Sequence, residues 1–211
     1  KITSFEVGYG LRLPSFTMNV NLYSTKWGNR FVSRSFTNTG GTTGTAQFKN
    51  IEELHNGFEL EAKYTVASNF RISGMLSIGD WKYTKDFTST LFDDTNTEIG
   101  SGTLYTKDAK IGDAAQFVSF IQADYSVIDN LSFDLGWRNV NNLYADYSIV
   151  DSDFTSPDNQ GALKLPSYNL IDLGTTYRFN LFGNNTYARL NINNLFNEEY
   201  IMESNTNIHS D

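Results

Sequence analysis

The most constraining feature of this sequence is a two-residue alternation of apolar and polar side chains that returns in segment after segment. Neighbouring side chains of a β-strand point to opposite faces, so this period predicts strands with one apolar and one polar face. The pattern is clear at 5–13, 16–23, 58–66, 131–138, 171–180 and 186–193, and less clean at 70–78 and 115–127. We therefore predict an all-β chain with eight antiparallel strands.

The two less regular segments carry specific expectations. Continuing the register of 70–78 would place Asp80 on the apolar side, which predicts either a β-bulge or the end of the apolar band at that point. In 115–127, the alternation places Val118 and Phe120 on the otherwise polar face.

Composition agrees with an all-β fold and narrows the function. Aromatic residues make up 15% of the 211 residues, and such side chains favour pleated sheets. The net charge of -8 argues against nucleic-acid binding, which needs a basic surface. Because the chain has no cysteine, disulfide scaffolds, zinc ribbons and cysteine nucleophiles are excluded. The two histidines, His55 and His209, are interpreted as loop residues and leave little for metal or triad chemistry.

The connections between the predicted strands alternate in length. Short connections fall at 13–15, 67–69, 128–130 and 182–185, whereas long polar ones fall at roughly 28–56, 84–113 and 144–166. Tight turns at one end and long loops at the other are typical of an outer-membrane β-barrel. A strand of only ~9–11 residues crosses a bilayer, so the lack of a long apolar run does not argue against this fold. The alternative is a soluble β-sandwich or a barrel with a binding or adhesion role.

Aromatic side chains are placed as a membrane barrel requires. A set on the apolar face near the short turns suits an interfacial girdle: Phe16, Tyr64, Phe70, Tyr125, Phe133, Tyr177 and Phe179. Trp27, Trp81 and Tyr83 lie towards the long connections and are interpreted as part of the outer girdle. The alternative for these three, together with Tyr144 and Tyr147, is stacking against a ligand.

The order of turns predicts that both termini lie on the side of the long loops. Four short turns and three long loops differ from a complete eight-stranded barrel with periplasmic termini, which has three turns and four loops. The polar tail at 203–211 does not have the pattern of a closing strand. We therefore expect both ends to be cut, and we expect no pairing between the 2–12 and 186–196 strands.

A family resemblance enters at residues 190–200, which read L-N-I-N-N-L-F-N-E-E-Y. This segment resembles the penultimate strand of TonB-dependent receptors, which commonly reads N-x-x-N-L-F-(D/N)-x-x-Y. Segments 57–62, 79–83, 112–116 and 165–168 agree. The chain resembles the C-terminal barrel of Bacteroidetes-type receptors, including those with a carboxypeptidase-regulatory-like N-terminal domain. The resemblance implies that 1–211 is one part of a barrel of about 22 strands, without the plug domain and the last strand.

The resemblance also implies a function and partners. The parent protein would be a receptor in the Gram-negative outer membrane that takes up an oligosaccharide, a peptide or a metal chelate. Its partners would be outer-membrane lipid, the TonB complex through the missing N-terminal region, the ligand and a surface lipoprotein. Neither nucleic acid nor a cofactor is expected, and the chain is not expected to be an enzyme. Gly8 and Gly10, on the polar face, are interpreted as leaving room for the plug.

Carboxylates are the main candidates for chemistry in this chain. Adjacent carboxylates occur at Glu52-Glu53, Asp93-Asp94 and Glu198-Glu199, but neighbours on a strand point to opposite faces and make poor acid/base pairs. Two loop clusters carry the oxygen ligands that calcium prefers, although neither has EF-hand spacing: Asp93, Asp94, Asn96 and Glu98, and Asp151, Asp153, Asp158 and Asn159. Ordinary polar loops are the preferred interpretation. We therefore predict no catalytic, cofactor or metal residue, and the ligand-binding residues stay unassigned.

The charge of the long loops bears on the ligand. Asp93, Asp94, Glu98, Asp151, Asp153 and Asp158 outweigh Lys85, Lys107 and Lys110. An acidic surface repels anions, so the sequence favours an oligosaccharide or peptide over a strongly anionic ferric siderophore.

Overall fold

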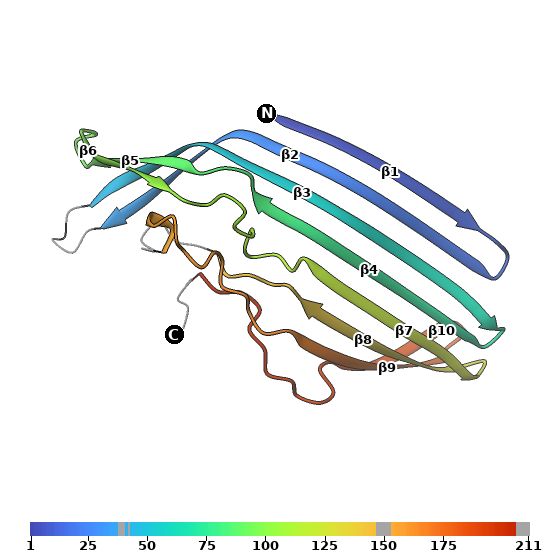
Figure 1. Ribbon diagram of the computed structural model, residues 1–211. Coiled ribbons are helices and arrows are strands. Elements are labelled where there is room, and N and C mark those ends of the chain that lie inside the picture. The colour runs from blue at the N-terminus through green and yellow to red at the C-terminus, as the bar shows by residue number, and fades with distance from the viewer. Residues whose placement is uncertain (38–40, 42, 147–152, 206–211) are drawn as a thin grey trace.

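The computed structural model describes residues 1–37, 41, 43–146 and 153–205. Within them, ten strands form one antiparallel sheet, accompanied by a short 3-10 helix, η1 (Asp153–Thr155) (Figure 1). The strands are β1 (Ile2–Arg12), β2 (Phe16–Thr37), β3 (Thr43–Ala67), β4 (Phe70–Tyr83), β5 (Phe87–Asp93), β6 (Glu98–Leu104), β7 (Phe117–Ile128), β8 (Leu131–Asn141), β9 (Tyr168–Leu181) and β10 (Asn184–Ile192).

Eight of these strands make the wall that the alternation predicts. They lie in the order β1-β2-β3-β4-β7-β8-β9-β10, so each predicted strand pairs with its neighbour in sequence. Among the described residues, β1 pairs only with β2 and β10 only with β9. The sheet is therefore open, and the prediction that this chain does not close on itself is confirmed.

The sheet has one apolar and one polar face. Cross-strand partners continue the apolar face from strand to strand, as in the row Val7, Leu22, Phe58 and Ile78. These side chains are not covered: Leu22 is 52% exposed and Leu135 is 49% exposed. An apolar surface of this extent needs a non-aqueous neighbour, and lipid meets that requirement.

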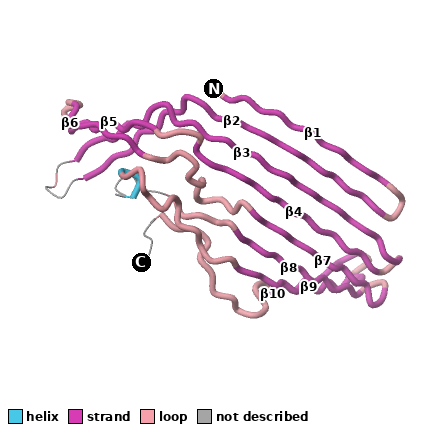
Figure 2. Tube along the Cα trace, in the orientation of Figure 1, coloured by secondary structure: helices cyan, strands magenta, loops and turns pink. Residues whose placement is uncertain are grey.

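The four short connections lie together at one end of the wall, as predicted (Figure 2). Leu13 and Phe16 exchange backbone hydrogen bonds across a two-residue turn. Between β9 and β10, Phe182 and Gly183 both have positive φ angles, of 52° and 84°. That combination gives a type I′ turn, whose twist matches a two-residue hairpin.

The long connections differ from the prediction. Much of 28–56 and 84–113 is strand rather than loop, because β2 and β3 run on for 22 and 25 residues and β5 and β6 form a hairpin. Because a membrane crossing needs only ~9–11 residues of each strand, β2 and β3 are about twice as long as a crossing requires. Asn29 and Asn50, with φ angles of 54° and 60°, lie at irregularities in the β2–β3 register. Each irregularity moves the side chains of a given face from odd-numbered to even-numbered positions or back. A search for one continuous alternation therefore does not detect these parts of the strands.

We call residues 28–37, 43–53 and 87–104 the extension. In it, β5 pairs with residues 44–49 of β3, beyond the point where the β3–β4 pairing ends at Glu53 and Tyr83. One face carries a separate hydrophobic core, whose buried members are Ala46, Phe48, Ile51, Tyr83, Phe87, Leu104, Ala109 and Phe154. Phe154, from η1, is fully buried, and its carbonyl accepts a hydrogen bond of 2.7 Å from the Tyr105 amide. The third long connection is thereby fixed against the extension.

The two segments with irregular alternation, 70–78 and 115–127, both form regular strand pairings around Asp80 and Phe120. The β3–β4 register is unbroken at Asp80, which excludes the bulge and leaves the other predicted alternative, the end of the apolar band. The pairing of β4 with β7 ends just before it, at Ile78. The Asp80 carboxylate forms an ion pair with Lys110. Phe120 does lie on the polar face, because its cross-strand partner is Arg138, whose guanidinium lies 5.7 Å from the ring centroid. No helix in the described ranges is long and apolar enough to cross a membrane.

Candidate ligand-facing site

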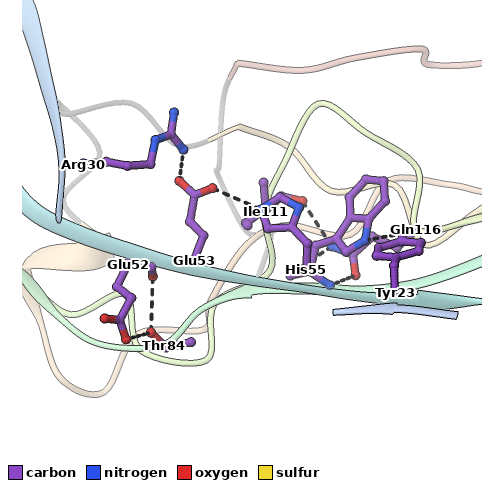
Figure 3. A network of polar contacts seen from close by, with 9 residues as sticks. Tyr23, Arg30, Glu52, Glu53, His55, Thr84, Ile111 and Gln116 are labelled. Carbon is purple, nitrogen blue, oxygen red and sulfur yellow. Dashed lines mark hydrogen bonds and ion pairs between the residues drawn. The ribbon is translucent and has the colours of Figure 1, made fainter. Parts of the chain in front are cut away.

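The most elaborate group of polar contacts in the described chain lies on the polar face, where the wall meets the extension. Glu53, only 5% exposed, accepts a hydrogen bond from the Arg30 guanidinium. Its second oxygen lies 3.1 Å from Nε2 of His55 (Figure 3). A buried carboxylate needs such partners, because an unpaired charge away from water is costly. Arg30 also lies over the Trp27 ring, 5.4 Å from its centroid.

Three rings cross β2, β3 and β4 at this level. Trp27 and His55 have centroids 6.3 Å apart, and His55 and Trp81 have centroids 5.6 Å apart. The register explains the row, because Trp27 pairs with Glu53 and Trp81 pairs with His55, all on the polar face. We call Trp27, His55 and Trp81 the aromatic row.

Trp81 is held in place on three sides. Its indole N–H donates a hydrogen bond of 3.0 Å to the Tyr23 hydroxyl. Its backbone N–H donates to Oε1 of Gln116, and its carbonyl accepts from Nε2 of the same side chain, at 3.0 and 2.8 Å. Gln116 is itself 2% exposed. This ring therefore has a single well-defined position.

Two glycines let rings of this group lie flat on the wall. A Cβ at Gly57 would stand 2.2 Å from the Tyr23 ring, and a Cβ at Gly79 would stand 2.8 Å from the Trp81 indole nitrogen. The two glycines are cross-strand partners on β3 and β4. The rings of Tyr23 and Trp81 therefore each place one face over a glycine, and the opposite face of each ring points away from the sheet.

A cavity of about 140 Å³ is lined in part by Arg30 and Glu53, which contact Trp27 and His55 of the aromatic row. Its lining mixes charged and apolar side chains: Arg30, Val32, Arg34, Phe48, Ile51, Glu53, Tyr83 and Asp146. Asp146 comes from the connection after β8, and its backbone N–H donates a hydrogen bond of 2.8 Å to the Ser204 carbonyl. The cavity therefore lies between the extension and the C-terminal half of the chain.

The placement of the loop-end aromatics corrects the sequence interpretation. Trp27 and Trp81 lie on the polar face, and Tyr83 is buried in the core of the extension, so an outer lipid-facing girdle of these three is wrong. Parity carries the signal that would have found this, because Trp27 continues the polar frame of Tyr23. Tyr144 forms an isolated bridge with Lys164, whereas Tyr147 lies outside the described residues.

The carboxylate pairs have separate structural roles. Glu52 and Glu53 point to opposite sides of β3 (Figure 3). Glu52 lies 2.8 Å from Lys26 and accepts a hydrogen bond of 2.6 Å from Thr84. These contacts, of which the one with Lys26 has the largest effect, lower the pKa of Glu52 to about 2. At the third pair, the Glu198 amide donates to the Asn194 side chain, which closes a turn after β10. Neither of these pairs has the shared geometry of an acid/base site.

The calcium candidates are built into loops. Asp93 Oδ1 accepts hydrogen bonds from the Thr97 and Thr95 amides, at 2.8 and 3.0 Å, and these bonds lower its pKa. This carboxylate thus closes the β5–β6 turn. Asn159 donates to the Tyr105 carbonyl at 2.9 Å, while Asp151, the side chain of Asp153 and His209 lie outside the described residues. In the part of the chain that the structure describes, no three His, Cys, Asp or Glu side chains are grouped to hold a metal.

The open antiparallel sheet, with an exposed apolar face and a charged polar face, defines the wall of a transmembrane β-barrel of the outer-membrane type. Comparison with known proteins agrees. The family model described as "TonB dependent receptor-like, beta-barrel" matches residues 1–195, and the chain belongs to this family.

One solved structure shows the same fold. It is the ferric-catecholate import receptor Fiu from E. coli K12 in its closed form, with 17% sequence identity and a TM-score of 0.59. The match covers 97% of this chain and 24% of that receptor, so the chain spans about a quarter of the receptor's length. No curated protein sequence matches the chain.

Proposed function

We propose that this chain forms part of the wall and of the extracellular mouth of a TonB-dependent receptor, which imports a nutrient across the outer membrane of a Gram-negative bacterium. The observation that carries the proposal is the two-faced sheet, whose uncovered apolar face suits lipid and whose polar face suits a filled or solute-conducting lumen. Membership of the receptor barrel family supports it. Residues 1–211 would form a C-terminal part of that barrel.

The proposed partners follow from this assignment. Outer-membrane lipid contacts the apolar face, and the TonB complex couples energy through an N-terminal region. We also propose that the complete receptor binds a surface lipoprotein. Its domain arrangement would be of the Bacteroidetes type, with a carboxypeptidase-regulatory-like N-terminal domain. The chain has no enzymatic role in it.

The proposed cargo is an oligosaccharide or a peptide in preference to an anionic metal chelate. Lys85 lies 3.6 Å from Glu52, and Lys110 is paired with Asp80, so these two basic groups are partly neutralised. Asp94 and Glu98 are exposed at the end of the β5–β6 hairpin. A mouth of this charge favours neutral or cationic solutes.

Uptake in whole cells tests the proposal. Strains with and without the complete receptor gene, each with and without a functional TonB complex, would be supplied with glycans, peptides or iron chelates as the sole source of a required nutrient. Growth that needs both the receptor and TonB supports import. Growth that depends on neither, together with receptor-dependent attachment to surfaces, would favour the alternative of a non-transport adhesion barrel.

A further inference from the structure

We infer that the aromatic row is a stacking platform for the pyranose rings of a neutral oligosaccharide, whose hydroxyl groups bind in the adjoining cavity. This inference rests on the proposed function, because it requires the polar face to line the lumen. It specifies the class of cargo and the residues that receive it.

The geometry of the row suits a chain of sugar rings. Trp27, His55 and Trp81 follow one another at 6.3 and 5.6 Å between centroids, a spacing comparable to the repeat of linked pyranose units, and neighbouring rings are tilted by 43° and 30°, so the row forms a twisted surface. All three side chains are partly exposed, with His55 at 24%. Aromatic faces offer a large apolar area to the C–H groups of a sugar ring while their polar edges stay hydrogen-bonded.

The platform is rigid before any ligand arrives. Gly79 lets the Trp81 indole lie against the wall, and the Tyr23 hydroxyl fixes its nitrogen. Arg30 packs against one face of the Trp27 ring and also holds Glu53, which in turn contacts His55. Side chains that are already ordered lose little conformational freedom on binding, which favours affinity for a ligand of matching shape.

The cavity supplies the polar half of a sugar site. The lining combines the planar guanidinium groups of Arg30 and Arg34 with the carboxylates of Glu53 and Asp146, of which Glu53 is already held by Arg30 and His55. Sugar hydroxyls interact with both kinds of group. The two positive and two negative side chains balance, so the cavity has no net attraction for a polyanion. An iron chelate of several negative charges would meet two carboxylates as well as two guanidinium groups.

A peptide fits this surface less well. Extended peptides commonly bind by adding a strand to an exposed sheet edge. At the aromatic row, β3 is paired on both sides, with β2 and with β4, so its backbone groups are already used. Recognition here has to come from ring faces and side-chain polar groups.

Binding to the complete purified receptor in detergent tests the inference. Calorimetric titration would use neutral gluco-, xylo-, manno- and galacto-oligosaccharides of four to six units as probes, with short peptides and a ferric catechol chelate alongside. We expect one oligosaccharide series to bind, and we expect Trp27→Ala and Trp81→Ala each to weaken that binding about tenfold or more. Trp81→Phe keeps a ring and should retain most of the affinity, even if removal of the whole ring disturbs folding.

The matched control is Trp137→Ala, which removes the same side chain from the opposite, apolar face, where it is 38% exposed. Its oligosaccharide affinity should stay within about twofold of the unaltered receptor, because this residue lies outside the platform. The inference is overturned if no oligosaccharide binds, or if Trp27→Ala and Trp81→Ala bind as Trp137→Ala does. TonB-dependent uptake of a peptide or chelate by the same receptor would then leave the proposed function standing and remove only the sugar site.

Discussion

The guanidinium of Arg189 donates two parallel hydrogen bonds to the carboxylate of Asp134, at 2.8 and 2.9 Å. The pair connects β10 to β8 across the intervening β9. It passes directly over Gly174, where a Cβ would lie 2.3 Å from the Asp134 carboxylate and 2.5 Å from the Arg189 guanidinium. A glycine on the middle strand is therefore what allows the outer two strands to be linked on the polar face.

Replacing Gly174 by alanine should break this arrangement. The added methyl group has no free space, so either the ion pair separates or β9 shifts, at a cost of about 1–3 kcal/mol in the free energy of unfolding. Urea unfolding of the refolded receptor measures that cost. Gly102→Ala is the matched control, since the nearest atom to its Cβ would be the Ser89 hydroxyl oxygen, at an ordinary contact distance of 3.9 Å. Equal stability of the two variants would contradict the steric role of Gly174.

The apolar face should not accept a charge. Arginine at Leu135, on the lipid side of β8, should destabilise the folded receptor in a bilayer by ~2–4 kcal/mol, because the guanidinium replaces lipid contact. Gln122→Arg provides the comparison on the polar face, where Gln122 already donates to Asp124 at 2.8 Å and an arginine finds the same acceptor. Reversible folding into liposomes measures both variants. Comparable losses for the two would remove the assignment of faces.

Glu52 should make the extension sensitive to acid. Its pKa is lowered from 4.5 to about 2 by Lys26, Thr84 and Lys85. A carboxyl group with a depressed pKa stabilises the fold above its unfolded pKa, and that contribution disappears as the pH falls through the folded value. As the pH falls from 4.5 to 2, the unaltered receptor should therefore lose the stabilisation that the Glu52 carboxylate provides, whereas the Glu52→Gln variant lacks this stabilisation at every pH.

Thermal unfolding of both proteins across that pH range tests this expectation. The difference between them should be largest near neutral pH and close to zero at pH 2. Glu98→Gln removes an exposed carboxylate from the tip of β6 and serves as the control. A constant difference between the unaltered receptor and Glu52→Gln at every pH would show that the ion pairs of Glu52 do not stabilise the extension.

Phe154 should hold the third long connection in place. Removing a fully buried phenylalanine typically costs about 3–5 kcal/mol, and here the loss should fall on the extension rather than on the wall. Hydrogen exchange of the complete receptor should show faster exchange in β5 and β6 of Phe154→Ala, with β8 to β10 unchanged. Phe31→Ala is the control, because Phe31 is 57% exposed. Uniform exchange changes along the whole sheet would contradict a separate core.

The sequence predicts the membrane-crossing part of the fold well for a physical reason. In a transmembrane barrel each wall strand faces lipid on one side and a polar lumen on the other, so strict alternation is required along residues such as those of 58–66. The extension has no such requirement. There, Ala46 and Phe48 pack against side chains from β5, β6 and η1, and their distant partners leave no regular local signal.

The candidate site was harder to predict because it depends on cross-strand register. Trp27, His55 and Trp81 are far apart in the sequence, and they become neighbours only through the pairing of β2 with β3 and of β3 with β4. The asparagine-associated irregularities in β2 and β3 then bring Arg30 onto the same face. Neither the register nor these irregularities can be read from residue types alone.

The most direct test of the central claim is the accessibility of single cysteines in the complete receptor in living cells, made possible because this chain has no cysteine of its own. In an otherwise cysteine-free receptor, a membrane-impermeant maleimide should label Thr90→Cys on the extension in intact cells. Phe182→Cys, in a turn where this side chain is 94% exposed, should be labelled only after the outer membrane is permeabilised, and Leu135→Cys should stay protected in both conditions. Labelling of Phe182→Cys in intact cells with Thr90→Cys protected, or full labelling of Leu135→Cys, would contradict an outer-membrane wall with the extension outside.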